Sequence, residues 1–262
     1  MQLTEEVRLE TRGPIAIITL SRPDKLNALT HAMGDAVRAH VARLNADPQV
    51  RVVLVRGEGR AFSAGGDLAF LRDNAARSEA ENRAGMRDFY AKFLSLRALE
   101  VPSIALIHGR ATGAGLSFAL GCDMRVAAED AKVSANFVRV GLNPGMGATF
   151  LLERLIGPAR AAELVYTGRD VEMGEALAIG LVNHIVQADR LEATGLELAG
   201  RIAESAPVAI RRTKALMRRD DEALARALDG EAAAQAACFT TLDLQEGIQA
   251  VQERRAPRFT GA

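Results

Sequence analysis

The sequence predicts an α/β protein whose parallel strands are joined by helical crossovers. Two observations lead to this fold class: short segments rich in β-branched residues alternate with amphipathic helical segments, and this alternation continues through most of the chain. Right-handed crossovers between parallel strands explain such an order better than a sandwich or a helical bundle does. A chain of 262 residues, 48% hydrophobic and 25% charged, fits one large domain, or one domain with a small appendage.

Five segments are predicted strands because each is short, apolar and bounded by Gly, Pro or polar residues. They are residues 15–20, 51–57, 103–109, 122–127 and 181–186. Apolar residues spaced at i, i+3 and i+4 predict helices between these strands, at 31–47, 77–99, 158–166 and 190–203.

Beyond about residue 200 the strand pattern stops. The segments 207–219, 221–238 and 240–254 are rich in Ala, Arg and Glu and have helical periodicity. We therefore expect an α/β core over residues 1–199 and a helical C-terminal subdomain over residues 200–262.

Charge and cysteine content exclude several classes of partner. Lys and Arg total 33 and Asp and Glu total 33, so no net charge attracts nucleic acid or an anionic membrane. Cys122 and Cys238 lie far apart without neighbouring ligands, which indicates neither a disulfide framework nor a metal site. Residues 1–13 do not resemble a signal peptide, and no apolar run reaches the length of a membrane span. These features predict a cytoplasmic protein.

Two glycine-rich turns each follow a predicted strand and precede a helix. In AFSAGGDL (61–68), Gly65 and Gly66 form a tight turn and Asp67 is a candidate N-cap. In HGRATGAGLSFALGCD (108–123), Gly113 and Gly115 flank Ala114 at the start of a helix. Unpaired N–H groups at a helix start, approachable because glycine has no side chain, suit an oxyanion. The alternative is that both are ordinary turns.

Two other motifs match the second turn only in part. The dinucleotide-binding pattern G-x-G-x-x-G would need glycine where Phe118 stands. The serine-hydrolase pattern G-x-S-x-G, with Ser117 as nucleophile and His184 as base, has Ala119 in place of the second glycine. Ser117 also lies inside the predicted helix instead of at a strand-to-helix turn, so we set both readings aside.

Five blocks in order resemble the enoyl-CoA hydratase/isomerase, or crotonase, family. They are SRPDKLNAL (21–29), AFSAGGDL (61–68), IHGRATGAGLSFALGCD (107–123), VGLNPGMGAT (140–149) and TGRDVEMGEALAIGLVNHIV (167–186), and together they cover nearly the whole chain. The resemblance implies a spiral of ββα units with a helical C-terminal trimerisation region, assembled as a homotrimer or a dimer of trimers. It also implies a role in fatty or aromatic acyl-CoA metabolism.

The resemblance also implies site residues. The amides of Ala64 and Ala114 match the oxyanion hole that binds the thioester carbonyl, and residues 24–28 match the turn around coenzyme A. The residues expected to contact the coenzyme A thioester are Lys25, Leu26, Ala28, Ala64, Gly65, Gly66, Asp67, Gly113 and Ala114. Lys25, Arg22 and Arg60 are candidates for phosphate contact, with solvated surface charge as the alternative.

The acids that this family uses for hydration are missing. Alignment places Ser117 and Phe137 at the two glutamate positions and Gly145 where certain isomerases have an aspartate. General acid–base catalysis contributes roughly 10²–10⁴-fold to a rate, so we expect hydration by the standard two-glutamate mechanism to be severely slowed. Ser117, Phe137 and Asn136 are pocket candidates. The helical segment after the first turn offers substitutes for the acids: Glu79, Glu81, Asp88 and Tyr90.

The sequence thus predicts an enzyme that stabilises a thioester enolate, a hydratase/isomerase-type lyase or isomerase whose exact reaction is open. The alternatives are a non-catalytic acyl-CoA-binding protein and a decarboxylase or other enolate-forming enzyme of the same fold. We expect no permanently bound cofactor, no metal, no nucleic acid and no membrane partner, and acyl-CoA as the small-molecule substrate.

Overall fold

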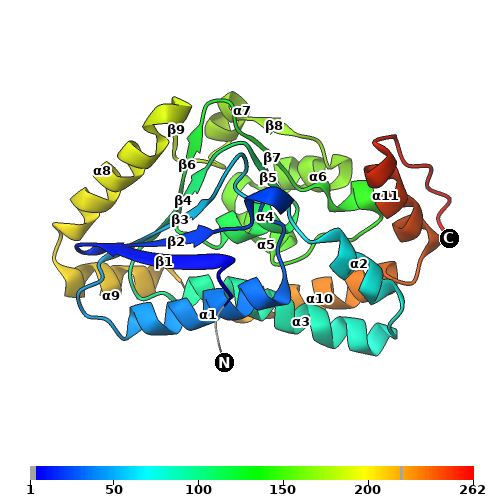
Figure 1. The fold of residues 1–262 in the computed structure, drawn as a ribbon, viewed down its shortest axis with the longest axis horizontal. Coiled ribbons are helices and arrows are strands. Elements are labelled where there is room, and N and C mark those ends of the chain that lie inside the picture. Colours follow the sequence, from blue (N-terminus) through cyan, green and yellow to red (C-terminus); the bar gives the residue numbers. More distant parts are fainter. Residues whose placement is uncertain (1–3, 219–220) are drawn as a thin grey trace.

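The computed structural model describes residues 4–218 and 221–262, and it has a six-stranded sheet at its centre (Figure 1). The strand order is β1-β2-β3-β4-β6-β9; β1 is antiparallel to β2 and the other neighbours are parallel. The strands are β1 Val7–Arg12, β2 Ile15–Leu20, β3 Val52–Gly57, β4 Ser103–Ile107, β6 Met124–Ala128 and β9 His184–Val186. All five strands predicted from the sequence are present in this sheet.

A second, three-stranded sheet has the order β5-β7-β8. Its strands are β5 Arg110–Thr112, β7 Lys132–Ser134 and β8 Val171–Glu172. Strand β5 begins three residues after β4 ends, so the chain passes directly from one sheet into the other. This step brings the second glycine-rich turn to the end of β5.

Helices cover the sheets and form the C-terminal part of the chain. They are α1 His31–Asn45, α2 Leu68–Ala75, α3 Glu79–Leu94, α4 Ala114–Leu120, α5 Ala148–Ile156, α6 Pro158–Thr167, α7 Met173–Ala178, α8 Leu191–Ala203, α9 Pro207–Met217, α10 Asp221–Cys238 and α11 Leu242–Glu253. Short 3₁₀ helices are η1 Pro23–Lys25, η2 Ser95–Ala98, η3 Asn136–Val140 and η4 Ala188–Arg190. Beyond residue 200 the described chain contains helices and no strand, as predicted, and residues 254–262 after α11 are not helical. Residue 219 of the predicted helix 207–219 lies outside the described residues.

The sheet forms the core between helices. Strand β2 is buried along its whole length and β3 almost so, because both are interior strands and helices such as α1 and α8 pack on the faces of the sheet. Figure 1 shows α8 on one side of the sheet, and α1, α3 and α10 along the opposite edge of the molecule. The predicted division after residue 199 stays a prediction; α8 spans this position.

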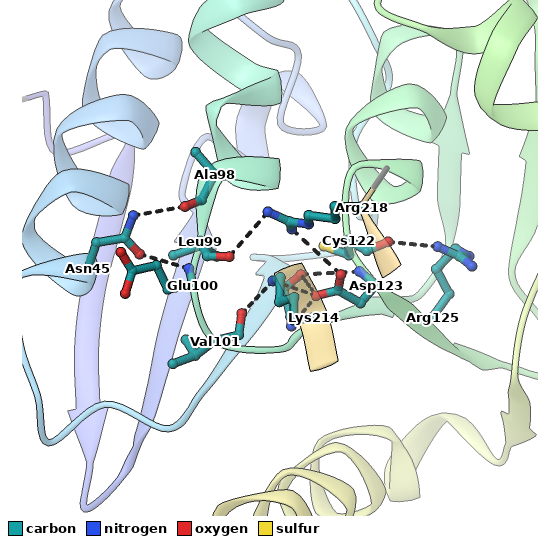
Figure 2. Close-up of polar contacts among 11 residues, drawn as sticks. Asn45, Ala98, Leu99, Glu100, Val101, Cys122, Asp123, Arg125, Lys214 and Arg218 are labelled. Carbon is teal, nitrogen blue, oxygen red and sulfur yellow. Dashed lines mark hydrogen bonds and ion pairs between the residues drawn. The ribbon is translucent and has the colours of Figure 1, made fainter. Parts of the chain in front are cut away.

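Buried polar contacts attach α9 to the core (Figure 2). The Lys214 ammonium donates to the carboxylate of Asp123 at 2.7 Å and to the Val101 carbonyl at 2.5 Å. Arg218 lies 3.6 Å from the same carboxylate and donates to the Leu99 carbonyl at 3.2 Å. These contacts bind α9 and the residue that follows it to the segments directly before β4 and β6.

Candidate active site

The two glycine-rich turns lie against each other. The ideal Cβ position of Gly65 would be 3.4 Å from the Ala114 nitrogen and 2.7 Å from the Thr112 carbonyl oxygen, at a φ of +91°. A side chain there would collide with the backbone, so residue 65 must be glycine for the turns to touch. The hydroxyl of Thr112 donates to the Ala64 carbonyl at 2.9 Å and holds the two turns together.

The backbone of the first turn determines which amides face away from the protein. Gly66 pairs with Leu29 in a parallel bridge: Leu29 donates to Gly65 at 2.7 Å and Asp67 donates to Leu29 at 3.3 Å. Because Leu29 exchanges these bonds with the residues on either side of Gly66, the N–H of Gly66 points to the opposite side. Neither this N–H nor that of Ala114, the first residue of α4, donates to any residue the structure describes.

Ala64, predicted as an oxyanion donor, is not available for that role. Its N–H donates to the Leu26 carbonyl at 2.8 Å, so the bond holds the turn to the segment 22–28. Sequence spacing could not distinguish Ala64 from Gly66, because both lie in the same turn. The decisive facts are the bridge to Leu29 and the left-handed φ of Gly65.

A cavity of about 650 Å³ opens beside the two turns. Its walls include eleven residues expected to contact the ligand or line the pocket: Lys25, Leu26, Ala28, Ala64, Gly65, Gly66, Asp67, Gly113, Ala114, Asn136 and Phe137. Much of the remaining wall is apolar, with Phe70 and Phe89 stacked at a centroid separation of 5.1 Å. The structure thus brings together residues that are more than one hundred positions apart in the chain.

Ser117 was predicted to be a pocket residue, and this prediction is wrong. The side chain is 1% exposed and lies outside the cavity wall. Its hydroxyl is within hydrogen-bonding distance of the carbonyls of Gly113, at 3.3 Å, and Gly145, at 3.1 Å. As a short side chain inside α4, Ser117 satisfies backbone groups of its own helix and of the adjacent loop.

Carboxylates are nearly absent from the cavity wall. Among its described residues only Asp67 is acidic, and it caps α2 by accepting from the Ala69 N–H at 2.8 Å. Arg22 donates to it at 2.6 Å. Burial would raise the pKa of Asp67, but these hydrogen bonds hold that pKa below its usual range. Asp67 is therefore a paired, ionised structural group.

Of the four substitutes considered in the segment after the first turn, only Tyr90 lines the cavity. Glu81 forms a capping box with Ser78, Asp88 pairs with Lys92 at 2.8 Å, and Glu79 is exposed. Burial raises the pKa of the Tyr90 hydroxyl well above its usual range, so it remains protonated. Of these four candidates, the cavity wall therefore contains a neutral phenol and no carboxylate.

The loop at the cavity mouth is held by Asn27, which the sequence prediction missed. This buried side chain accepts from the Arg22 N–H at 2.8 Å and donates to the carbonyls of Glu58 and Ala61 at 2.9 and 2.8 Å. Leu26 and Asn27 both have left-handed backbone conformations, which asparagine tolerates better than most residues. Asparagine inside a predicted turn was the available signal. Lys25, within this loop, is exposed.

Comparison with known proteins identifies the family of this chain. The family model described as enoyl-CoA hydratase/isomerase matches residues 10–262. The chain belongs to the enoyl-CoA hydratase/isomerase family. Its members process acyl-CoA thioesters, and the crotonase fold expected from the sequence is confirmed.

Several relatives of this family member are similar along their whole length. A crotonyl-CoA hydratase from Syntrophomonas wolfei is 36% identical, covering 97% of this chain and 98% of the relative. A short-chain-enoyl-CoA hydratase from Clostridium acetobutylicum is 33% identical, with 95% of each chain covered. The crystal structure of an enoyl-CoA hydratase from Mycobacterium avium subsp. paratuberculosis superimposes with a TM-score of 0.86 at 30% identity, over 97% of this chain and 98% of that one.

No helix in the described part of the chain is both long and apolar enough to span a membrane. Residues 4–218 and 221–262 contain no group of three or more His, Cys, Asp or Glu side chains placed to hold a metal ion.

Proposed function

We propose that this protein binds an acyl-CoA thioester with the thioester oxygen between the N–H groups of Gly66 and Ala114, and stabilises the enolate that forms there. The observation that carries this proposal is the pair of unpaired amides at the wall of a largely apolar cavity. Donors already in place for developing negative charge need no reorganisation during the reaction, and removing one such donor typically costs about 10²–10³-fold in rate.

The donors are positioned by the main chain. The Leu29 bridge orients Gly66, and Gly113 donates to the Ser134 carbonyl at 2.8 Å directly before Ala114. The start of α4 adds the positive end of a short helix to the same place. Coenzyme A would enter over the loop 22–28, with Lys25 next to its phosphates.

The wall of the cavity argues against hydration by two carboxylates. Phe137 is 7% exposed at one acid position, and Ser117 is hydrogen-bonded away from the cavity at the other. We infer that the reaction forms its enolate without a carboxylate base. Decarboxylation of a malonyl-type thioester meets this condition: the bond to the carboxylate breaks, carbon dioxide leaves, its bonding electron pair becomes the enolate, and a proton from the solvent completes the product.

Three assays on the purified protein test this proposal: crotonyl-CoA hydration, carbon dioxide release from malonyl- and methylmalonyl-CoA, and calorimetric titration with a non-reactive acyl-CoA. We expect tight thioester binding, decarboxylation, and hydration at least about 10²-fold below that of a two-glutamate relative. Hydration equal to that relative would contradict the assigned loss of the acids. Binding without turnover would indicate an acyl-CoA-binding protein, and absence of binding would contradict the site.

Assembly and location are separate proposals. We propose a homotrimer or dimer of trimers, supported by the family assignment and by the helical C-terminal region. Light scattering coupled to size exclusion would return three or six times the 28.0 kDa chain mass. A cytoplasmic location is consistent with the thiols, which form no disulfide in the described chain.

A further inference from the structure

The cavity contains two buried polar side chains that the proposed thioester binding does not use. Tyr90 comes from α3 and Gln235 from α10, and they are 2% and 3% exposed. The Tyr90 hydroxyl donates to Gln235 Oε1 at 2.8 Å, and Gln235 Nε2 donates to the Asn143 carbonyl at 2.7 Å. The two residues form a fixed polar pair, named here the Tyr90–Gln235 pair.

The pair occupies the space beside Gly145. A Cβ atom on residue 145 would overlap the Tyr90 hydroxyl oxygen and lie 2.6 Å from Gln235 Nε2. Glycine at this position therefore allows a phenol and an amide to stand where a side chain from residue 145 would project. All three residues line the same cavity as Gly66 and Ala114.

The hydrogen-bonding capacity of the pair is not exhausted. The Tyr90 hydroxyl donates its one hydrogen to Gln235 and keeps acceptor capacity. The Gln235 amide has two N–H donors, and within the described chain only the bond to Asn143 is formed from Nε2. One amide N–H thus remains for a ligand in a place where an unpaired donor is costly.

The surroundings of the pair are apolar. Met86, Phe89 and Met146 also line the cavity and are at most 4% exposed, whereas Lys25 at the mouth is exposed. From this difference in exposure we infer that the pair lies at the buried end of the cavity, away from Lys25. An acyl group that lacks a polar atom would cover the free N–H without pairing it.

We propose that the Tyr90–Gln235 pair selects acyl groups that carry an oxygen atom, hydroxyl or carbonyl, on the part that reaches the buried end of the pocket. Gln235 donates its free N–H to this oxygen, and Tyr90 orients the amide by holding its Oε1. This inference rests on the proposed acyl-CoA binding and adds the class of acyl group. Sites that hydrogen-bond a substrate oxygen discriminate strongly against analogues that lack it.

Size-matched thioesters test the selection by calorimetric titration. The pairs are 3-hydroxybenzoyl- against 3-methylbenzoyl-CoA, 4-hydroxybenzoyl- against 4-methylbenzoyl-CoA, and 6-hydroxyhexanoyl- against heptanoyl-CoA. We expect at least one oxygenated member to bind about tenfold or more tightly than its partner. If the methyl compound binds equally well or better in all three pairs, the selection is refuted.

Two variants test whether the Tyr90–Gln235 pair causes the preference for an oxygenated acyl group. Gln235→Met removes the amide at similar size and should bring the two affinities within about twofold, and Tyr90→Phe should reduce the preference by loosening the amide. Gln249→Met, on an exposed position of α11 outside the cavity, should keep the wild-type ratio. A preference unchanged in Gln235→Met would overturn the assignment.

The outcomes separate this inference from the proposed function. Affinity for the methyl compounds reports thioester binding itself and shows that each variant is folded. Loss of affinity for every thioester in the wild-type protein would contradict the proposed function. Retained affinity without an oxygen preference would contradict this inference alone.

Discussion

At the residue scale, Gly66 and Ala64 differ in the direction of one N–H group. The Ala64 N–H donates to the Leu26 carbonyl, whereas that of Gly66, a residue of the cavity wall, points away from Leu29 and has no partner among the described residues. Residue 66 has a φ outside the left-handed region, and a Cβ there would approach only Leu71, at 3.9 Å. The position accepts a side chain, so its role can be tested without disturbing the turn.

Gly66→Pro and Gly66→Ala form a matched pair for this test. Proline removes the N–H and alanine retains it, so we expect turnover to fall about 10²–10³-fold in the first variant and by less than about threefold in the second. Steady-state kinetics on the active thioester substrate checks this. Equal activity of the two folded variants would show that the Gly66 amide is not a donor to the oxyanion.

Ser117→Ala should affect stability and not binding. The substitution leaves buried carbonyls of Gly113 and Gly145 with one donor fewer, which costs about 1 kcal/mol of unfolding free energy. Urea unfolding measures this loss, and titration with a non-reactive acyl-CoA should give an unchanged affinity. A large drop in affinity would contradict this prediction and indicate that Ser117 contacts the ligand.

Single residues were predicted with mixed success for a physical reason. Eleven of the twelve expected pocket and contact residues lie on the cavity wall, since glycine-rich turns between strands and helices are visible in sequence. The direction of one amide, or of a serine inside a helix, depends on φ angles and long-range partners. Gln235 was missed because it lies 145 residues from Tyr90, and nothing local marks the contact.

At the scale of elements, the loop 22–28 owes its shape to one side chain. Asn27 makes three hydrogen bonds to the backbone of residues 22, 58 and 61, and its own carbonyl accepts from the Ser63 hydroxyl at 2.8 Å. The loop and the first glycine-rich turn are therefore parts of one hydrogen-bonded unit. A change at Asn27 should reach the pocket through this unit.

Asn27→Ala tests that coupling. Loss of three buried hydrogen bonds should lower the unfolding free energy by about 2–4 kcal/mol and weaken acyl-CoA binding at least tenfold. The control is Asn45→Ala, because Asn45 also bonds two backbone groups, Ala98 and Glu100, but far from the cavity (Figure 2). That variant should lose stability and keep its affinity; equal effects on affinity would contradict the coupling.

The sequence analysis missed the edge strand β1 and the three strands of the second sheet. Strand β1, Val7–Arg12, has one buried residue and several charged ones, because it is an edge strand whose pattern has no apolar run. Strands β5, β7 and β8 have two or three residues each, too few for a period to appear. The predicted helices were found because amphipathic periodicity persists over several turns.

At the scale of the whole molecule, the ion pair between Lys214 and Asp123 connects α9 to β4 and β6. Burial lowers the pKa of Lys214 to about 8, while Asp123 opposes that shift. Burial would raise the pKa of Asp123, but Lys214 and Arg218 outweigh it and hold that pKa below its usual range. The pair is thus charged near neutral pH, with Lys214 7% exposed.

Asp123→Asn should destabilise the folded protein, because it leaves a buried ammonium without its carboxylate. We expect a loss of about 2–4 kcal/mol at pH 7, reduced from the fully buried case because the Asp123 side chain is 30% exposed. The pKa of Asp123 is lower in the folded protein than in the unfolded chain. The stabilisation that its ionised carboxylate provides is therefore complete above about pH 5 and is lost as the pH falls through the folded pKa.

Urea unfolding of wild type and Asp123→Asn between pH 7 and pH 3 checks the sign of this effect. The difference in unfolding free energy between wild type and Asp123→Asn should become smaller as the pH falls toward 3. Glu197→Gln, which removes an exposed surface pair with Arg190, should have little effect at any pH. A gap that stays constant down to pH 3 would show that Asp123 ionisation does not stabilise α9 docking.

The bridge between Leu29 and Gly66 affects how the protein can evolve. The groups that orient the Gly66 amide are main-chain atoms, which no point substitution alters directly. Side chains on the cavity wall, such as those of Phe137 and Gln235, can be substituted without altering these main-chain bonds. Under the proposed function, substrate choice and thioester activation are therefore separately mutable, and new acyl specificities can arise while the two amides stay in place.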